Sequence, residues 1–313
     1  MKRKENALLT ISHGSGAQFM AISVIGRELA AEYKQLYIVS HNKYFADMLA
    51  LELPNVKSIS YQELGPLYTS IMMNKGKWDV FNDWPYNVGS FVLREDNFYD
   101  TYRELVGLKR KNDWDETGSD TVPYLNTLPQ DLITAAEDFN KQHPNFVLVQ
   151  FAGGINPTTP VEQRKQSIMQ PEQGLKRKYP LDKAEKLVEG LVAKGYEVVQ
   201  YCLPEEPHVK GCIYLQQEQS QLFYYAISKY CKFVVCIDSS LMHLTIAQAP
   251  KVFAIWGQTQ PIGFGYKKAI NIIPDNYIPI SPYFTGIPDT PYLDYPEPEV
   301  ILERVENYLN DFN

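Results

Sequence analysis

The sequence predicts an α/β protein made of two Rossmann-like domains, each with a parallel sheet flanked by helices. Apolar strands alternate with helical segments throughout the chain, which is typical of parallel sheets joined by helical crossovers. The chain has 313 residues, which is long for one core and suits two domains of about 150 residues each. We therefore expect a first domain at residues 1–142, a second at 143–290, and a C-terminal helix at 291–313 that packs back toward the first domain.

The composition excludes several classes of protein. Hydrophobic residues make up 44%, charged residues 21%, and the net charge is −7. No run of Lys or Arg is long enough to follow a phosphate backbone, so we expect no nucleic-acid partner. The four cysteines lack metal-ligand spacing and are interpreted as reduced thiols of a cytoplasmic protein. The basic N-terminus is followed by too few apolar residues for a signal peptide or a membrane span.

The first domain begins with a βαβ unit. Its predicted strands lie at residues 7–11, 35–40, 56–60 and 78–83, and its predicted helices at residues 18–33 and 45–53. The loop at residues 12–16 follows the first strand and contains two glycines. Residues 86–127 are rich in aromatic residues, Asp and Asn without a clear period, and the sequence predicts no elements there.

The second domain repeats the alternation. Its predicted strands lie at residues 145–154, 196–203, 211–216 and 269–274, and its predicted helices at residues 181–195 and 220–230. A further strand, helix and strand occupy residues 233–259. A final helix is predicted at about residues 297–309, after a stretch rich in proline.

The most informative stretch is Phe233–Thr259, where polar residues stand between a buried strand and a helix. Asp238 ends the strand, Ser239 or Ser240 can cap the helix, and His243 lies in its first turn. In open α/β sheets, ligands bind outside the carboxyl ends of the strands, and a helix N-terminus favours an anion. These residues are therefore candidates for binding a phosphate, with His243 adding a charge-assisted hydrogen bond. The alternative is an ordinary helix cap with a structural histidine.

Two further clusters also follow or precede predicted elements. Lys176, Arg177 and Lys178 stand just before a helix, where a basic cluster is favourable only if an anion binds there. Glu205 and Glu206 follow a strand, where a carboxylate can accept hydrogen bonds from ribose hydroxyls. The alternatives are a solvated charged loop for the first cluster and a surface turn for the second.

These motifs resemble glycosyltransferase family 9, the heptosyltransferases, which adopt the two-domain GT-B fold. The family has Lys-Arg-Trp-Pro before a helix, and here the chain has Lys176 to Pro180, with one extra residue and Tyr for Trp. The turn at Leu203–Glu206 matches a family turn that ends in Glu. The family pattern Asp-Ser/Thr-Gly-x-x-His-Leu-x-x-Ala is matched by Asp238–Ala247, with Ser240 in place of Gly, and the following strand ends in Gly257-Gln258-Thr259.

The resemblance implies that two domains face each other across a cleft and that the second domain binds a nucleoside-diphosphate sugar. Its diphosphate would lie at Asp238–His243 and its ribose near Glu205 or Glu206. The family places a general base, an Asp, after the first strand, but the best alignment puts Gln18 there, which has no suitable pKa. His13 and Asp83 are then the candidate bases. The loop of Gly14, Ser15, Gly16 and Gln18 also resembles the Gly-rich substrate loop of fucosyltransferases.

The function expected from these residues is inverting transfer of a sugar, heptose-like or other, to a hydroxyl of a glycan or lipid-linked saccharide. We expect no divalent metal, since cationic side chains can stabilise the leaving diphosphate, and no cofactor besides the sugar donor. We expect a monomer, and we leave open a peripheral contact with a membrane. Two alternatives remain. One is a catalytically degenerate nucleotide- or glycan-binding protein of the same fold, and the other is a Rossmann-like methyltransferase that uses the loop at residues 13–16.

Overall fold

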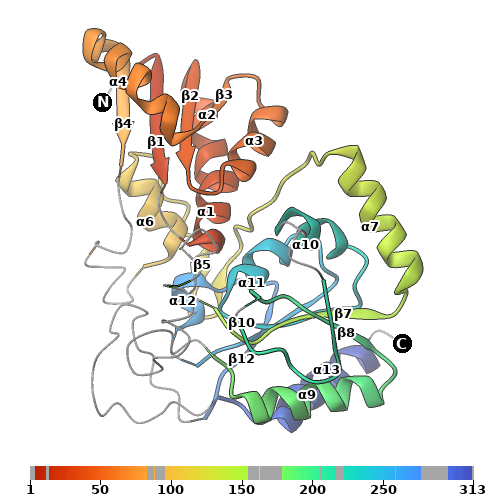
Figure 1. Ribbon diagram of the computed structural model, residues 1–313. Helices are drawn as coiled ribbons and strands as arrows, with labels where there is room; N and C mark the ends of the chain where they lie inside the picture. Colours follow the sequence, from red (N-terminus) through yellow and green to blue (C-terminus); the bar gives the residue numbers. More distant parts are fainter. Residues whose placement is uncertain are drawn as a thin grey trace. The chain divides into compact units, whose positions relative to one another are not determined.

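The computed structural model describes residues 4–11, 14–82, 88, 96–153, 162, 178–204, 206–215, 221–257, 259–275 and 295–311. Contacts between residues divide the chain into two units, whose elements are labelled in Figure 1. Unit 1 comprises Met1–Trp114 and Thr121–Leu128, and unit 2 comprises Asp115–Asp120 and Pro129–Asn313. The predicted boundary after residue 142 differs from this division by the helix at residues 130–142 and by the short segment at residues 115–120.

Unit 1 is built on a four-stranded parallel sheet with strand order β3-β2-β1-β4. Its strands are β1 (Asn6–Ile11), β2 (Gln35–Ser40), β3 (Val56–Ile59) and β4 (Trp78–Phe81), as the sequence predicts. Its helical elements are α1 (Ser15–Met20), η1 (Ala21–Gly26), α2 (Arg27–Glu32), α3 (Lys43–Glu52), η2 (Tyr61–Glu63), α4 (Leu64–Met73), η3 (Lys75–Lys77) and α6 (Phe98–Leu105).

One helix runs without interruption from Ser15 to Glu32, because the residues that join α1, η1 and α2 all keep helical backbone angles. It begins three residues before the predicted start at residue 18. The middle segment η1 is a π-helix, in which each turn holds an extra residue. Gly26 allows this helix to approach the sheet, because a Cβ atom there would lie 3.1 Å from Ile38 and 3.2 Å from Leu49.

The two faces of the first sheet are covered differently. Side chains alternate between the faces, so Leu8 and Val39 point away from the face that Gly26 approaches. They pack with Trp78 and with Ile71 of α4 in a small apolar cluster. Ile71 is the one residue of α4 that is buried. This face of the sheet therefore has a thin cover.

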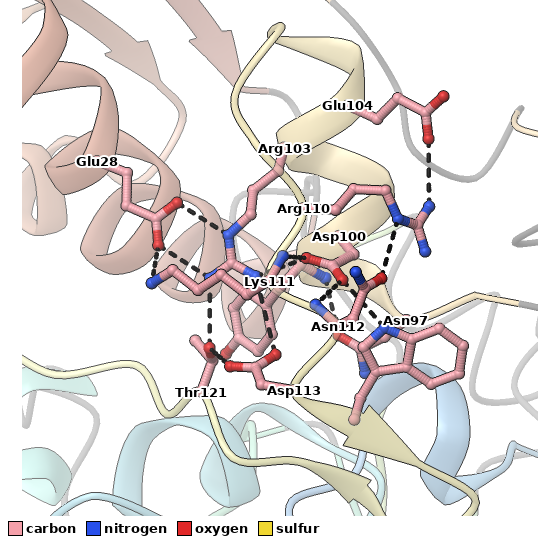
Figure 2. A network of polar contacts seen from close by, with 12 residues as sticks. Glu28, Asn97, Asp100, Arg103, Glu104, Arg110, Lys111, Asn112, Asp113 and Thr121 are labelled. Carbon is pink, nitrogen blue, oxygen red and sulfur yellow. Dashed lines mark hydrogen bonds and ion pairs between the residues drawn. The ribbon is translucent and has the colours of Figure 1, made fainter.

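The segment that the sequence leaves without elements contains α6 and a network of charged side chains, drawn in Figure 2. Asn97 caps α6 by accepting a hydrogen bond from the N–H of Tyr99. Arg103 is fully buried and pairs with Glu28 at 2.9 Å and with Asp100 at 2.8 Å. Glu28 belongs to α2, so this pair fastens α6 to the long helix.

Asp100 is the centre of that network. Burial acts to raise its pKa, but hydrogen bonds from the N–H groups of Lys111 and Asn112 and from Arg103 outweigh burial and hold the pKa below its usual range. The indole N–H of Trp114 donates to the same carboxylate at 3.1 Å. A single ionised carboxylate thus orders the chain that follows α6.

Unit 2 contains a six-stranded parallel sheet with strand order β12-β11-β10-β7-β8-β9. Its strands are β7 (Phe146–Gln150), β8 (Glu197–Gln200), β9 (Cys212–Tyr214), β10 (Val234–Ile237), β11 (Val252–Ile255) and β12 (Ile270–Ile272). Its helices are α7 (Gln130–Gln142), α9 (Leu181–Ala193), α10 (Gln221–Ile227), α11 (Ser240–Thr245), α12 (Pro261–Phe264) and α13 (Pro298–Asp311). The predicted α/β class with parallel sheets is confirmed.

Helices cover both faces of the second sheet (Figure 1). On one face α9 packs beside α13, and the core there includes Leu187, Leu191, Ile301 and Val305. On the other face Phe139 of α7 contacts the strand residue Phe146 and Phe223 of α10. The C-terminal helix, expected to pack toward the first domain, thus contributes its two most buried apolar residues to the core of unit 2.

A short hairpin lies where the chain passes from unit 1 to unit 2, with Trp114 counted in unit 1 and Asp115–Asp120 in unit 2. It consists of β5 (Trp114–Asp115) and β6 (Gly118–Ser119), and Ser119 pairs with Tyr266 through the hydrogen bonds Ser119 N–H to Gly265 O and Lys267 N–H to Ser119 O. Gly118 has φ +122°, and a Cβ atom there would lie 2.3 Å from the carbonyl carbon of Gly265. Only glycine fits this contact.

No helix in the described ranges is long and apolar enough to cross a membrane.

Candidate functional site

The strand order of unit 2 identifies a switch point. From β7 the chain adds β8 and β9 on one side of the sheet and then β10, β11 and β12 on the other. β7 and β10 are hydrogen-bonded neighbours, and their connections leave in opposite directions. A crevice opens at the carboxyl ends of two such strands, and ligands of open α/β sheets bind there. Gln150 ends β7, and Asp238 and Ser239 directly follow β10.

Gln150 and Ser239 shape this point. The side-chain oxygen of Gln150 accepts a hydrogen bond from the N–H of Leu241 at 2.9 Å, so β7 supplies the cap of α11. Ser239 occupies the N-cap position without a capping bond from its own side chain. Its hydroxyl is buried and has no hydrogen-bond partner within the described part of the chain. Gly153 lies against it, because a Cβ atom on Gly153 would be 3.2 Å from the Cβ of Ser239.

His243 is 5% exposed and lies between two polar groups. Its Nδ1 atom is 2.7 Å from the hydroxyl of Tyr266, and its Nε2 atom is 3.7 Å from Oδ1 of Asp238. The second distance is too long for a hydrogen bond but close enough for an ion pair with a protonated ring. The contact with Tyr266 fixes the orientation of the ring and leaves Nε2 on the side of Asp238. We call Gln150, Asp238, Ser239, His243 and Tyr266 the switch-point cluster.

Ser240 is held by the neighbouring strand. The hydroxyl of Tyr201, just beyond β8, receives a hydrogen bond from the side-chain N–H of Gln221 at 2.7 Å and is also hydrogen-bonded to the side chain of Ser240. Burial raises the pKa of Tyr201, so this hydroxyl keeps its proton. The turn after β10 is thus fixed from β7 by Gln150 and from β8 by Tyr201.

The predicted basic cluster is described in part. Lys178 forms an isolated antiparallel bridge with Ala152, one residue before Gly153. Lys178 therefore lies next to the loop that contacts Ser239. Lys176 and Arg177 lie outside the described residues.

The predicted acidic turn is also described in part. Glu206 is buried, and its carboxylate accepts a hydrogen bond from the N–H of Leu203 at 2.8 Å. One carboxylate oxygen of Glu206 thus stabilises the turn formed by Leu203–Glu206. Glu205 lies outside the described residues.

In unit 1, the first turn of α1 is tied to Asn42, the N-cap residue of α3. The side-chain oxygen of Gln18 accepts the N–H of Asn42 at 2.9 Å, and the amide of Asn42 donates to the hydroxyl of Ser15 at 2.8 Å. Gln18 is fully buried, Ser15 and Gly16 are buried, and Gly14 is exposed. Gln18 therefore joins the first turns of α1 and α3.

The two candidate bases, His13 and Asp83, lie outside the described residues. In the sequence they follow β1 and β4 closely, and these neighbouring strands form the switch point of the first sheet, with order β3-β2-β1-β4. Their place in the chain is consistent with a role at the first sheet's carboxyl edge.

Sequence reasoning missed Gln150, Tyr201 and Tyr266. Gln150 could have been found, because it is the one polar residue at the end of the apolar strand Phe146–Gln150. Tyr266 stands 23 residues after His243 and follows a short helix that the sequence analysis does not predict. Nothing in the local pattern points to it.

The acidic residues near the hairpin have a cationic partner. Lys267 contacts Asp115 at 3.2 Å and Asp120 at 3.0 Å.

Across the described ranges, no group of three or more His, Cys, Asp or Glu side chains is arranged to hold a metal ion.

Comparisons with known proteins give one family and one fold. Residues 162–279 match the model of glycosyltransferase family 9 (heptosyltransferase). This segment includes the whole of the motif from Asp238 to Thr259. A search of curated protein sequences gives no match.

Several solved structures share the fold along the whole chain. A family 9 glycosyl transferase from Veillonella parvula has a TM-score of 0.66 and 15% identity, covering 99% of this chain and 98% of that one. The ADP-heptose lps heptosyltransferase II of E. coli has a TM-score of 0.58 and 14% identity, with coverage of 98% and 99%. The dodecameric iron-containing heptosyltransferase TibC in complex with ADP-D-beta-D-heptose has a TM-score of 0.60 and 12% identity, with coverage of 99% and 79%.

The predicted resemblance is therefore confirmed: residues 162–279 match glycosyltransferase family 9, and the chain as a whole has the GT-B fold of these glycosyltransferases.

Proposed function

We propose that this protein is a glycosyltransferase that binds a nucleoside-diphosphate sugar at the switch-point cluster and transfers the sugar to a hydroxyl of a glycan acceptor. One observation carries the proposal. The family motif Asp238–His243 lies at the switch point of the second sheet, with a buried Ser239 hydroxyl and an oriented His243 beside it. A diphosphate needs donors and a cation at such a place. TibC, whose structure holds ADP-D-beta-D-heptose, makes ADP sugars the first donors to test.

In this proposal the leaving diphosphate is stabilised by side chains. The Nε2–H of His243 and the hydroxyl of Ser239 donate to its oxygens, and the basic cluster of Lys176, Arg177 and Lys178 balances its charge. Such fixed donors stabilise charge that develops in the transition state. We propose that no divalent metal takes part, and that transfer inverts the anomeric centre with His13 or Asp83 as base. Glu205 or Glu206 would bind the ribose.

The donor site is tested by nucleotide binding. A thermal-shift panel of nucleoside diphosphates and nucleotide sugars should show specific stabilisation by one nucleotide, since a ligand of the native state raises apparent stability. Titration calorimetry with that nucleoside diphosphate should then show an affinity about tenfold or more lower for His243→Ala, because a hydrogen bond to a charged group is lost.

His143→Ala is the matched control for this experiment. His143 also faces a carboxylate, Glu197, at 2.9 Å, but Glu197 begins β8 and lies at the amino edge of the sheet. This variant should bind the nucleotide as the wild type does. If His243→Ala also kept full affinity, the donor-site assignment would be wrong.

Catalysis is tested separately. Release of nucleoside diphosphate should require both donor and acceptor, should persist in EDTA, and should fall by orders of magnitude in either His13→Ala or Asp83→Asn. The configuration of the product, followed by nuclear magnetic resonance, should be opposite to that of the donor.

A second candidate function is favoured by Gln18. In the sequence alignment Gln18 falls at the position of the family's catalytic Asp, and in the structure Gln18 is buried and its side-chain oxygen accepts the N–H of Asn42. A catalytically degenerate protein that binds nucleotides or glycans would have this property. Nucleotide binding without any release of nucleoside diphosphate, for every donor and acceptor tried, would support this candidate against the enzyme.

A further inference from the structure

Helix α4 of unit 1 differs from the other surface helices in its chemistry. None of its ten residues is charged, and Ile71 alone is buried. Met73 is 80% exposed, Met72 62% and Tyr68 44%. Large apolar side chains this exposed and this close together mark a surface that contacts another apolar phase or another protein.

The sheet beneath α4 extends the same surface. Lys57, Tyr37, Leu8 and Val80 are register partners across β3, β2, β1 and β4, so they lie in one row on one face. Leu8 packs in the cluster that holds Ile71, which places this row under α4. Val80, at one end of the row, is 47% exposed. Lys57, at the other end, is also exposed and lies over the ring of Tyr37.

The charged side chains at the C-terminal end of α4 are cationic, whereas Glu63 precedes its N-terminal end. Lys75 and Lys77 directly follow α4, and both are exposed. From Leu64 to Val80 the sequence contains a single acidic residue, Asp79. Asp79 points to the opposite face and pairs with Lys4 and the hydroxyl of Tyr33. The chain carries a net charge of −7, so a locally cationic and apolar surface is not explained by its composition.

We propose that this surface, formed by Tyr68, Met72, Met73 and Val80 with Lys57, Lys75 and Lys77, binds the face of an anionic lipid bilayer. A helix lying in the membrane interface inserts apolar side chains between the headgroups, while adjacent lysines contact anionic lipid. Each lysine near an anionic membrane strengthens binding several-fold. The charge complementarity selects an anionic bilayer over a neutral one. The proposal does not depend on the proposed donor site.

Vesicle co-sedimentation of the full chain tests the proposal. Vesicles of phosphatidylcholine with phosphatidylglycerol should bind the protein, and vesicles of phosphatidylcholine alone should bind it about tenfold or more weakly. The double variant Met72→Ser, Met73→Ser should lose most binding by removing apolar contacts. Lys75→Gln, Lys77→Gln should weaken binding to the anionic vesicles about tenfold and leave the weak binding to neutral vesicles unchanged.

Matched controls separate the surface from general effects. Leu51→Ser removes a residue that is 65% exposed on α3, and Lys186→Gln, Lys210→Gln removes two exposed lysines of unit 2. Both should bind vesicles as the wild type does, and all variants should keep the wild-type circular dichroism spectrum and nucleotide affinity. Wild-type protein that does not co-sediment with anionic vesicles would overturn the proposal. The proposal would also fail if Met72→Ser, Met73→Ser left vesicle binding unchanged but altered the oligomeric state in sedimentation without vesicles. That result would identify a second copy of the chain as the partner of this surface.

Discussion

A buried pair of charged side chains contributes to the stability of unit 1. Asp100 and Arg103 are both fully buried, and the pair is completed by Glu28, by backbone N–H groups and by the indole of Trp114. Removing one member of such a pair leaves the other charge buried without compensation, which is far more costly than losing an exposed pair.

Asp100→Asn should lower the free energy of unfolding at pH 7 by about 3 kcal/mol. The pKa of Asp100 is lower in the folded state than in the unfolded chain. Its contribution is therefore complete above the unfolded pKa of about 3.9 and is lost as the pH falls below it. The variant should thus lose less stability than the wild type between pH 5 and pH 3, as measured by urea unfolding followed by circular dichroism.

Asp47→Asn is the control, because Asp47 pairs with Lys43 on the exposed side of α3. Its effect should stay within about 0.5 kcal/mol. An Asp100→Asn variant as stable as Asp47→Asn would show that the network does not support the fold.

The same residues show where sequence reasoning ends. Arg103 and Glu28 are 75 positions apart, and no local period marks either as buried. By contrast, Asp238, Ser239 and His243 follow an apolar strand directly, and a local pattern sufficed to group them. The alignment puts Gln18 at the family's base position, but its hydrogen bond with Asn42 depends on the starts of α1 and α3 meeting in space, which the sequence does not show.

At the scale of elements, apolar runs and helical periods were enough for the long strands and for α3, α9, α10 and α13. Helix α4 was not predicted, because its exposed apolar residues hide the amphipathic period. The hairpin and α12 were missed because each has very few residues and depends on contact with the other. Local propensity says little about such elements.

The hairpin supplies a test of that dependence. Gly118→Ala should destabilise the docking of β6 on α12 by about 3 kcal/mol, since the new methyl group overlaps the backbone of Gly265 and the backbone has positive φ. Hydrogen exchange at the N–H groups of Ser119 and Lys267 should become much faster, because these groups donate the docking hydrogen bonds.

Gly195→Ala isolates the effect of the backbone angle. Gly195 has φ +86° but no atom within 4 Å of a Cβ, so this variant should cost about 1 kcal/mol and leave the hairpin amides protected. Equal exchange at Ser119 in both variants would contradict the overlap at Gly118.

For the whole molecule, the proposed donor site has a clear location. Every residue of the switch-point cluster belongs to unit 2, at the ends of β7 and β10 and after α12. A nucleoside diphosphate should therefore slow hydrogen exchange chiefly at residues 238–243 and 150–153, as measured by mass spectrometry. Protection concentrated at the loop of residues 14–18 would instead indicate a cofactor site in unit 1, as in the methyltransferase alternative.

The division of the chain also bears on how the protein is made. Synthesis runs from the N-terminus, so β1 to α6 leave the ribosome first. Their contacts are completed only when Thr121 and Asn126 have been synthesised, because Thr121 accepts a hydrogen bond from Arg103 and the N–H of Asn126 donates to Glu52. Before those residues arrive, the ribosome has already synthesised residues 115–120, and Tyr266, the bridge partner of Ser119, is not yet translated. Unit 1 therefore cannot be completed before this short segment of unit 2 has been made, and no single cut in the gene would release either unit whole.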